Sequence, residues 1–395
     1  MVLPASQLVQ QLNQKKADFL DYGKEIKKVY KIYQTALQHW QAKTIAEING
    51  AVDSKTSSWG ARPIEPWQQS WRLPLGVKWS CRQMALDWAK AQLLNVTVVG
   101  VDGSQIVPTE EIHLPVGVVQ AGWFLNPHSP DSYDVNYVKD VVLELITPAE
   151  LQQAEQRLRQ PQTYRFQERY IHLRRFQLEL KTLQQRMAEV KGSALLLFDG
   201  SFVATFAESY APEWQSEYVN AVCKTLSASK ECSIPVVAYI DQSKARDVVT
   251  LLAHLQRLEP NPYLSDAQLF NSVLTEWGDR SPLFICDRGG ILESYGHWAH
   301  GIGFCYLKAH QGYPVRLEFP LWIYDAGLLP SVISWVCGEL ITGQGYPYAL
   351  ETADQVAVLQ GSDRQAFLKQ LQVWAEDTGI KLHFNRKWVS KQQRR

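Results

Sequence analysis

Two segments of the chain share one pattern, in which an apolar run is followed directly by Asp-Gly-Ser. The segments are VVGVDGS, which ends at Ser104, and LLLFDGS, which ends at Ser201. Such runs predict buried strands, and a carboxylate at the end of a strand lies where α/β proteins build their sites. Asp-Gly alone is ordinary turn chemistry. Because two copies follow fully apolar strands, the pattern favours Asp102 and Asp199 as functional carboxylates.

The ligand types near these aspartates point to a hard cation. Carboxylate oxygens suit Mg²⁺ or Mn²⁺, and neither a histidine cluster nor a thiol pair lies nearby in the sequence to suggest zinc or copper. The six cysteines are scattered without a Cys-x-x-Cys pair, which argues against a zinc ribbon and against a disulfide framework. We expect reduced thiols, most of them buried.

The rest of the chain predicts an α/β fold. Short apolar runs between turn residues predict strands, and apolar residues spaced by three and four predict helices. Thr147-Pro148-Ala149-Glu150 is typical of a helix start with a capping box. Strands are expected at 95–104, 114–126, 140–146, 194–201, 234–241, 281–287, 301–309 and 313–321, and helices after residue 147, through an apolar stripe at 173–190, and near 213–226 and 244–257.

The N-terminal region has a different character. Apolar residues from Leu12 to Trp40 recur at seven-residue spacing, which predicts one long amphipathic helix in search of a partner. Residues 49–74 are rich in Pro, Ser, Trp and Gly, which predicts a connector wrapped on the surface. The expected organisation is an N-terminal helical region and connector at 1–92, a main domain at 93–375, and a basic tail at 376–395.

Charge and hydropathy say little about partners. Forty basic and forty acidic residues give no net charge, so a nucleic-acid surface would have to be a local patch. The N-terminus does not resemble a secretion signal, and no stretch approaches the ~20 apolar residues that span a bilayer. We therefore expect a cytoplasmic protein with no membrane partner.

Two further acids are candidates on predicted helices. Glu179 lies at the edge of the apolar stripe, where it could face the sheet or could be a solvated carboxylate paired with Arg175 or Arg186. Asp354 is expected on the inner face of a helix that starts near Pro347. An acid among apolar neighbours needs a partner, a proton or a metal, and an arginine or a backbone amide could equally satisfy it.

Weaker candidates are basic or aromatic. Surface lysines and arginines are usually just solvated, and packing is the commoner use of tryptophan. Glu318 follows an apolar strand and could support the site or form a strand-end salt bridge. The residues that could contact phosphates are Lys244, Arg246, Arg288 and Lys308 with Arg316, and those that could stack on single-stranded bases are Trp59, Trp67 and Trp71.

In this order and at these separations, the motifs resemble the NurA family of DNA-end-processing nucleases. The resemblance covers roughly residues 93 to 370. Each piece is short, and the specificity comes from the series. The pieces are VDGSQ at Asp102, an Arg–Glu helix at Arg174 and Glu179, LLFDGS at Asp199, and then YLK, RLEFP and GYPYAL with Tyr346.

The resemblance implies a ribonuclease-H-like mixed sheet flanked by helices. It further implies a homodimer, manganese or magnesium dependence, and partnership with a HerA-type hexameric ATPase translocase in resecting double-strand breaks. The activity implied is a 5′-to-3′ exonuclease and single-strand endonuclease acting on DNA ends.

The resemblance also assigns roles to residues. Asp102, Glu179 and Asp199 would hold one or two metal ions for phosphodiester hydrolysis, and Tyr346 would orient the phosphate. One position departs from the family pattern, because Asp354 stands where the family often has a histidine. Asp354 can still ligate a hard cation or position a water, but it cannot act as a neutral imidazole base.

Two other functions remain open at this point. A non-catalytic DNA clamp or helicase adaptor of the same fold would keep the architecture without cleavage. An ATP-binding protein of the actin and sugar-kinase type would also use strand-Asp-Gly-Ser turns, but it needs two repeated subdomains. The sequences that flank the two Asp-Gly-Ser segments are not repeats of each other, and no GxxxxGK[ST] loop is present.

Overall fold

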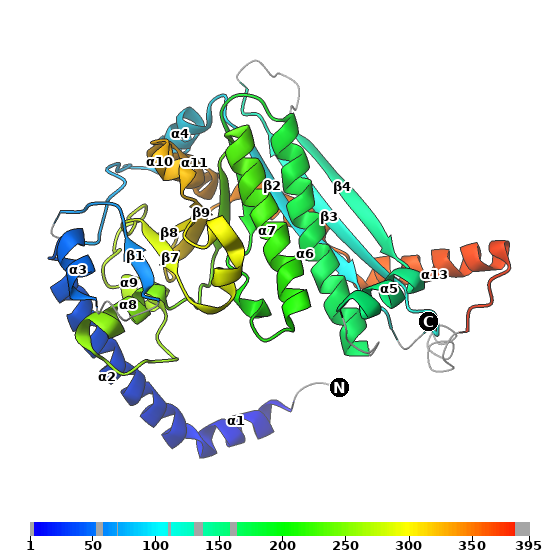
Figure 1. Ribbon diagram of the computed structural model, residues 1–395, viewed down its shortest axis with the longest axis horizontal. Coiled ribbons are helices and arrows are strands. Elements are labelled where there is room, and N and C mark those ends of the chain that lie inside the picture. The colour runs from blue at the N-terminus through cyan, green and yellow to red at the C-terminus, as the bar shows by residue number, and fades with distance from the viewer. Residues whose placement is uncertain are drawn as a thin grey trace. The chain divides into compact units, whose positions relative to one another are not determined.

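The computed structural model (Figure 1) describes residues 4–52, 58–68, 70–109, 112–129, 137–158 and 164–383. The chain folds into two compact units, each assembled from three stretches. Unit 1 comprises residues 1–77, 240–289 and 303–317, and unit 2 comprises residues 78–239, 290–302 and 318–395. The basic run NRKWVSKQQRR, which begins at residue 385, lies outside the described residues.

Unit 2 is built on a mixed sheet. Its strands are β2 (Thr97–Ile106), β3 (Gly117–Asn126), β4 (Val138–Ile146), β5 (Ala194–Asp199) and β6 (Val236–Ile240). They are ordered β6-β5-β2-β3-β4: an antiparallel meander of β2, β3 and β4 extended by the parallel strands β5 and β6. This is a ribonuclease-H-like arrangement, and the predicted fold class, an α/β mixed sheet flanked by helices with an N-terminal helical region, is confirmed.

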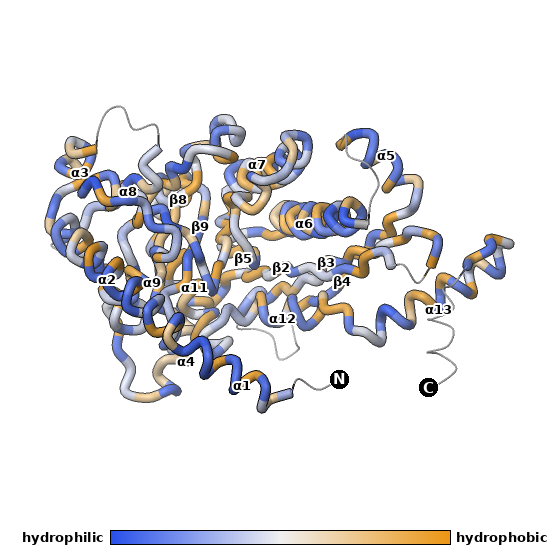
Figure 2. Tube along the Cα trace, turned by 90° about the horizontal axis from the view of Figure 1, so that it is seen from below, coloured by the Kyte–Doolittle hydropathy of each residue, from blue (hydrophilic) through white to orange (hydrophobic). Residues whose placement is uncertain are grey.

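Helices cover both faces of this sheet. The helices α6 (Tyr164–Glu189) and α7 (Pro212–Cys232) pack together, and Figure 2 shows α6 on one side of the sheet with α12 (Tyr348–Ala357) and α13 (Gly361–Thr378) on the other. The predicted stripe on α6 is buried, since Leu173, Leu180 and Leu183 have no exposed surface. Burying each such side chain contributes about 1.5–3 kcal/mol, so the stripe holds α6 on the sheet.

The close packing of α12 depends on a glycine. A Cβ on Gly122 in β3 would lie 2.6 Å from the Ala357 nitrogen and 2.9 Å from the Ala353 oxygen, which no real side chain tolerates. The small residues Ala353 and Ala357 face the sheet at the same place and are fully buried. The helix backbone therefore lies directly on the strand, which fixes where the polar residues of α12 fall relative to β2.

The remaining elements of unit 2 frame this layer. Thr147 and Glu150 form the predicted capping box, with the Glu150 side chain accepting from the Thr147 N–H at 2.8 Å. These elements are α4 (Arg82–Leu93), α5 (Pro148–Leu158), the 3₁₀ helices η1 (Thr205–Ala207) and η2 (Gly290–Trp298), α10 (Trp322–Asp325) and α11 (Leu329–Thr342).

Unit 1 holds the N-terminal helices and the strand order β1-β7-β8-β9. The last three residues of β9 belong to unit 2, as does the first residue of β8. The elements are α1 (Ala5–Gln14), α2 (Lys16–Trp40), α3 (Ile45–Ala51), β1 (Gly60–Pro63), α8 (Asp247–Gln256), α9 (Asp266–Phe270), β7 (Phe284–Asp287), β8 (Ile302–Leu307) and β9 (Val315–Pro320).

Two predictions for the N-terminal region need correction. The single long helix is divided at Lys15, and its apolar face is buried only from Tyr33 onward. The connector is not a surface strap throughout, because β1 pairs with β7 and Trp71 is fully buried against Phe270 and Phe284. Because residues 49–74 have no steady apolar period, the sequence did not predict the short strand β1 or the burial of Trp71.

Two further sequence predictions can be compared with the structure. All six cysteines are free; Cys286, Cys305 and Cys337 are buried, whereas Cys81 and Cys232 are exposed. Among the described residues, no helix combines the length and the apolar character needed to cross a bilayer.

Candidate active site

Asp102 and Asp199 come from neighbouring parallel strands. The pairing of β2 with β5 ends at Val101 and Phe198, so the next residues, Asp102 and Asp199, leave the shared ladder at the same level. Only Asp199 ends its strand, as predicted. Asp102 does not, because β2 stays paired with β3 through Ile106. The two Asp-Gly-Ser motifs are thus similar in sequence but different in backbone: a strand interior and a strand end.

The surroundings of Asp102 disfavour its negative charge. Burial is the largest of the causes that together raise its pKa to about 6; the nearby carboxylates of Asp199 and Asp354 act in the same direction. The Gly103 N–H, which donates to Asp102 Oδ1 at 2.7 Å, opposes them. A carboxylate surrounded by other carboxylates is stabilised by protonation or by a cation. Asp102 is therefore the centre of an acidic cluster.

Glu179 reaches the same place from α6. It is 3% exposed, and a Cβ on Gly103 would lie 2.1 Å from Glu179 Oε1, so the glycine of the first Asp-Gly-Ser motif makes room for this side chain. Burial raises the pKa of Glu179 to about 8, with Asp102 and Asp199 adding to the effect and Arg175 opposing it. Of the two interpretations from sequence, the one that faces the sheet is correct.

The neighbour of Glu179 is Arg175, one turn earlier on α6. Its Nη1 lies 3.1 Å from Glu179 Oε1 and donates to the Gly103 carbonyl at 3.1 Å. The contact with Glu179 has the distance of an ion pair but not the geometry of a hydrogen bond. Within the described residues, Glu179 Oε1 and Arg175 Nε are buried without a hydrogen-bond partner. Such orphaned polar atoms mark a site that is incomplete without a further group.

Tyr346 points at Asp199. Its hydroxyl donates to Asp199 Oδ2 at 2.8 Å, and its ring packs edge to face on Tyr239 with centroids 5.1 Å apart. Burial and the Asp199 carboxylate raise the pKa of Tyr346 far above its ordinary value. The phenol therefore stays protonated at neutral pH and can only donate its proton in a hydrogen bond to an anion.

Asp354 lies beside Asp102 but not where the helix pattern places it. The predicted inner face is wrong, since Leu350, Ala353 and Ala357 are buried and Asp354 is exposed. Asp354 lies at the edge of the apolar stripe of α12, so its carboxyl group does not pack on the sheet. From this exposed position it raises the pKa of Asp102.

Glu318 holds the loop that follows Asp199. Its Oε2 accepts hydrogen bonds from Ser201 Oγ and from the Phe202 N–H, both at 2.8 Å, and the residue is 1% exposed. The role as a support for the site, one of two considered from sequence, matches these contacts. A charged acceptor on a backbone N–H makes a strong hydrogen bond, so the turn after β5 is fixed in one shape.

The donor set fits a hard cation. Asp102, Glu179, Asp199 and Asp354 offer oxygens alone, which is the chemistry of Mg²⁺ and Mn²⁺ sites. Among the residues with a described placement, however, no three acidic, histidine or cysteine side chains stand close enough to form a ready metal site. Arg175 and Tyr346 contact two of the four acids instead, so these contacts have to yield before the acids could converge on an ion.

The basic residues singled out from sequence all lie in unit 1. Arg288 pairs with Asp247 through Nη2 at 2.7 Å, and Lys308 Nζ donates to Asn271 Oδ1 at 2.7 Å and to the Gly312 carbonyl at 2.6 Å. Lys244 and Arg246 line a separate cavity of about 550 Å³. Arg246 Nη1 also donates to the Asn261 carbonyl at 3.3 Å. Three of the four thus have structural contacts, and the roles of all four toward phosphate remain predictions.

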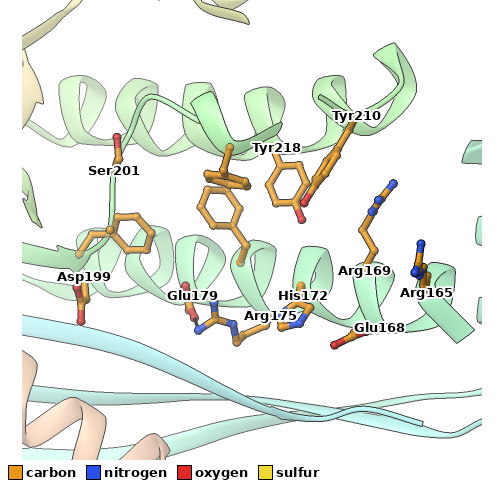
Figure 3. Close-up of a pocket in the computed structure, with 14 residues that line it drawn as sticks. Arg165, Glu168, Arg169, His172, Arg175, Glu179, Asp199, Ser201, Tyr210 and Tyr218 are labelled. Carbon is orange, nitrogen blue, oxygen red and sulfur yellow. Dashed lines mark ion pairs between the residues drawn. The ribbon is translucent and has the colours of Figure 1, made fainter. Parts of the chain in front are cut away.

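Sequence reasoning missed a cavity in unit 2 that reaches the acids. It has a volume of about 660 Å³, and Figure 3 shows its side chains in a row along α6, from Asp199 and Glu179 at one end to Arg165 at the other. The signal was present, since Arg165, Arg169, His172 and Glu179 are separated by helical spacings. It was hidden because the pattern concerns polar residues and not the apolar stripe.

Comparison with known proteins gives the class of this α/β fold and acidic site. The family model described as NurA domain matches residues 96–359, a span that contains all four acids and Tyr346. The chain belongs to the NurA domain family, a family of nucleases.

A solved nuclease structure is similar to this chain. The NurA nuclease from Sulfolobus solfataricus has a similar structure, with 15% sequence identity, a TM-score of 0.48, and coverage of 91% of this chain and 98% of that chain. No curated protein matches the sequence.

Proposed function

We propose that this chain is a metal-dependent DNA nuclease that hydrolyses phosphodiester bonds. The observation that carries the proposal is the convergence of four carboxylates from four different elements. Asp102, Glu179, Asp199 and Asp354 come from β2, α6, β5 and α12 and influence one another electrostatically. Glu179 and Asp199 also line one end of a cavity. Acids placed together at such a cost are typical of functional sites.

The residues that would hold the metal are the same four acids. Mn²⁺ or Mg²⁺, when bound, would supply positive charge that stabilises the phosphate as negative charge develops during hydrolysis. Two observations support this assignment: Glu179 Oε1 is buried without a hydrogen-bond partner among the described residues, and burial with nearby carboxylates raises the pKa of Asp102. Asp354 would contribute from the solvent side of the cluster.

The other site residues would act on the substrate and on the geometry. Tyr346 would turn its hydroxyl from Asp199 to a phosphate oxygen, because its phenol is a donor that stays protonated. Glu318 would keep Asp199 in position through the loop at Ser201 and Phe202. Arg175 would leave Glu179 for the phosphate when a metal takes its place, a change that keeps every charge compensated.

Family membership supports further proposals about the context. The chain would act on single-stranded and double-stranded DNA ends as a 5′-to-3′ exonuclease and single-strand endonuclease in the repair of double-strand breaks. Its partners would be a HerA-type hexameric translocase and a second copy of itself. The expected location is the cytoplasm.

A specific observation favours a second function, that of a non-catalytic DNA clamp or helicase adaptor. In the part of the chain that the structure describes, no three acids are close enough to hold an ion as they stand. An adaptor would keep DNA binding and lose cleavage. It would behave identically with metal and without it.

Cleavage of end-labelled DNA distinguishes the two functions. Purified protein is incubated with single-stranded and double-stranded oligonucleotides in Mn²⁺, Mg²⁺ or EDTA, alongside Asp102→Ala. The control is Asp87→Asn, which removes an exposed carboxylate on α4 in the same unit. We expect products in metal from the wild type and the control and none from Asp102→Ala. Binding without cleavage, even with the translocase added, would favour the adaptor.

A further inference from the structure

The cavity beside the acids has a basic end formed by α6. Arg165, Arg169, His172 and Glu179 line it at spacings of four, three and seven residues, which places them along one side of the helix. At 1.5 Å per residue, the path from Arg165 to Glu179 is about 21 Å long. The cavity therefore extends well beyond Glu179 and Asp199, the two acids of the cluster that line it, and its far part has a different chemistry.

Arg169 is held in place without using its hydrogen-bond donors. Its guanidinium lies 4.3 Å above the centre of the Tyr210 ring and 5.6 Å from that of Trp214. Within the described parts of the chain it has neither an ion pair nor a hydrogen bond. A guanidinium stacked on aromatic rings is oriented by its face, which leaves its N–H edges available to an anion.

The other groups at this end leave an excess of positive charge. Arg165 is exposed and, among the described residues, is likewise without an ion pair. Burial and Arg175 lower the pKa of His172, so this histidine is neutral. Among the described residues, Glu168 is the one acid that lines this part of the cavity, against the two arginines. The local charge favours phosphate although the whole chain is neutral.

An aromatic surface faces the same cavity. Phe206 lines it and is 51% exposed, which is unusual for a phenylalanine in a polar cavity. The ring is supported by edge contacts with Phe176 and Tyr218, whose centroids lie 6.0 Å and 5.0 Å away. An exposed and supported ring beside unpaired arginines is the combination that binds single-stranded nucleic acid, because bases stack on the ring and phosphates lie on the arginines.

We propose that this cavity is a binding subsite for the unpaired nucleotides that flank the bond to be cut. Arg165 and Arg169 contact phosphates, Phe206 stacks on a base, and the strand runs along α6 to the acids. The subsite rests on the proposed nuclease function and locates its substrate track. A duplex is excluded from it, because a volume of about 660 Å³ holds a ligand of a few nucleotides and because paired bases hide their faces.

The test is fluorescence anisotropy in EDTA, which measures binding without cleavage. The probes are a labelled dT15 strand and a labelled blunt hairpin duplex, titrated with full-length protein at several salt concentrations. The variants are Arg165→Ala with Arg169→Ala, and Phe206→Ala. The matched control is Arg82→Ala with Lys224→Ala, which removes two charges from exposed positions of α4 and α7 outside the cavity.

The double arginine variant should bind dT15 at least about tenfold more weakly, with a salt slope reduced by about 1.4, since each lost phosphate contact lowers it by about 0.7. Phe206→Ala should weaken binding by roughly fivefold or more at an unchanged slope. The control should match the wild type. If the alanine double variant fails to fold, Arg165→Gln with Arg169→Gln keeps side-chain length and predicts the same loss.

Two results would overturn the subsite. One is dT15 binding by the arginine variants that equals the control, and the other is a wild type that prefers the hairpin duplex over dT15. Parallel cleavage assays in Mn²⁺ keep this failure separate from failure of the nuclease function. Loss of dT15 binding in the variants supports the subsite even if no protein cleaves, whereas cleavage by the wild type with unchanged binding in the variants supports the nuclease alone.

Discussion

The two units each bury a cluster of charged side chains, and the clusters differ in their balance. In unit 1, Asp247 accepts from Arg288 and Arg316, and Asp266 accepts from the Tyr306 hydroxyl and two backbone N–H groups. Burial opposes the charge of Asp247, but the two arginines hold its pKa below the ordinary value. Burial and Asp247 raise the pKa of Asp266 to about 7, but each of these two acids has donors on its carboxylate, arginines on Asp247 and hydrogen-bond donors on Asp266.

In unit 2 the acids outnumber the cations. Arg175 contacts one of the four carboxylates, Glu179, and burial raises the pKa of both Asp102 and Glu179. A cluster that satisfies its own charges stabilises a fold, whereas a cluster that leaves acids unmatched is arranged for a ligand. The comparison therefore assigns structure to the charges of unit 1 and chemistry to those of unit 2.

The largest expected effect is on cleavage. Asp199→Asn should reduce the rate of DNA cleavage by about 10³-fold or more while leaving the unfolding temperature within a few degrees of the wild type, because it removes a metal ligand and one negative charge from a repulsive cluster. The rate is measured with end-labelled oligonucleotides and the fold by thermal unfolding. Full activity of this variant would contradict the assignment of the unit 2 acids to catalysis.

The corresponding substitution in the unit 1 cluster, Asp247→Ala, should reduce the stability of the fold. Asp247→Ala leaves Arg288 and Arg316 buried without their acid, which should cost about 3–5 kcal/mol of unfolding free energy. Urea denaturation of the variant and the wild type measures the difference. A loss below about 1 kcal/mol would mean that the unit 1 cluster is no more structural than the other.

Tyr346→Phe tests the donor in the active site. Removing the hydroxyl deletes the hydrogen bond to Asp199 and the proposed donor to phosphate, and loss of one such donor typically lowers kcat by about 10²-fold. The ring contact with Tyr239 is kept, so stability should change little. An unchanged kcat with a higher KM would instead mean that Tyr346 contributes to substrate binding alone.

Glu179→Gln tests the pH dependence of stability. The folded state raises the pKa of Glu179 from 4.5 to about 8, so it retains a proton that the unfolded chain releases. Wild-type stability should therefore fall as pH rises from about 4.5 to 8.

The glutamine variant lacks this ionisable group, so its stability should not fall over the same pH range when both proteins are measured in EDTA. Urea denaturation at several pH values measures it. Parallel pH profiles for the two proteins would show that Glu179 is ionised and satisfied.

The sequence predicted the parts of the fold that depend on local patterns. The strands around Asp102 and Asp199, the capping box at Thr147 and the stripe on α6 all follow from period and turn chemistry. Both aspartates lie on strands of the sheet, but only Asp199 ends its strand as predicted. The proximity of Asp102 and Asp199 also follows from similar strands that prove to be parallel neighbours.

What could not be predicted depends on contacts distant in sequence. Whether β2 ends at Asp102 is decided by its pairing with β3, and the exposure of Asp354 depends on how α12 lies on Gly122. Arg288 looked available to DNA because its partner Asp247 is 41 residues away. The interpretation of Arg165 and Arg169 as a binding surface depends on Phe206 and Tyr210, which line the same cavity but lie about 40 residues later in the sequence.

The most direct test of the central claim is a titration of the protein with Mn²⁺, followed by electron paramagnetic resonance of the free ion. The wild type and Asp87→Asn are compared with the double variant Asp102→Asn with Asp199→Asn. Saturable binding that is present in the first two and lost in the double variant is the predicted result. Absence of saturable binding by the wild type, or equal binding by the double variant, would contradict the assignment of the acidic cluster to a metal.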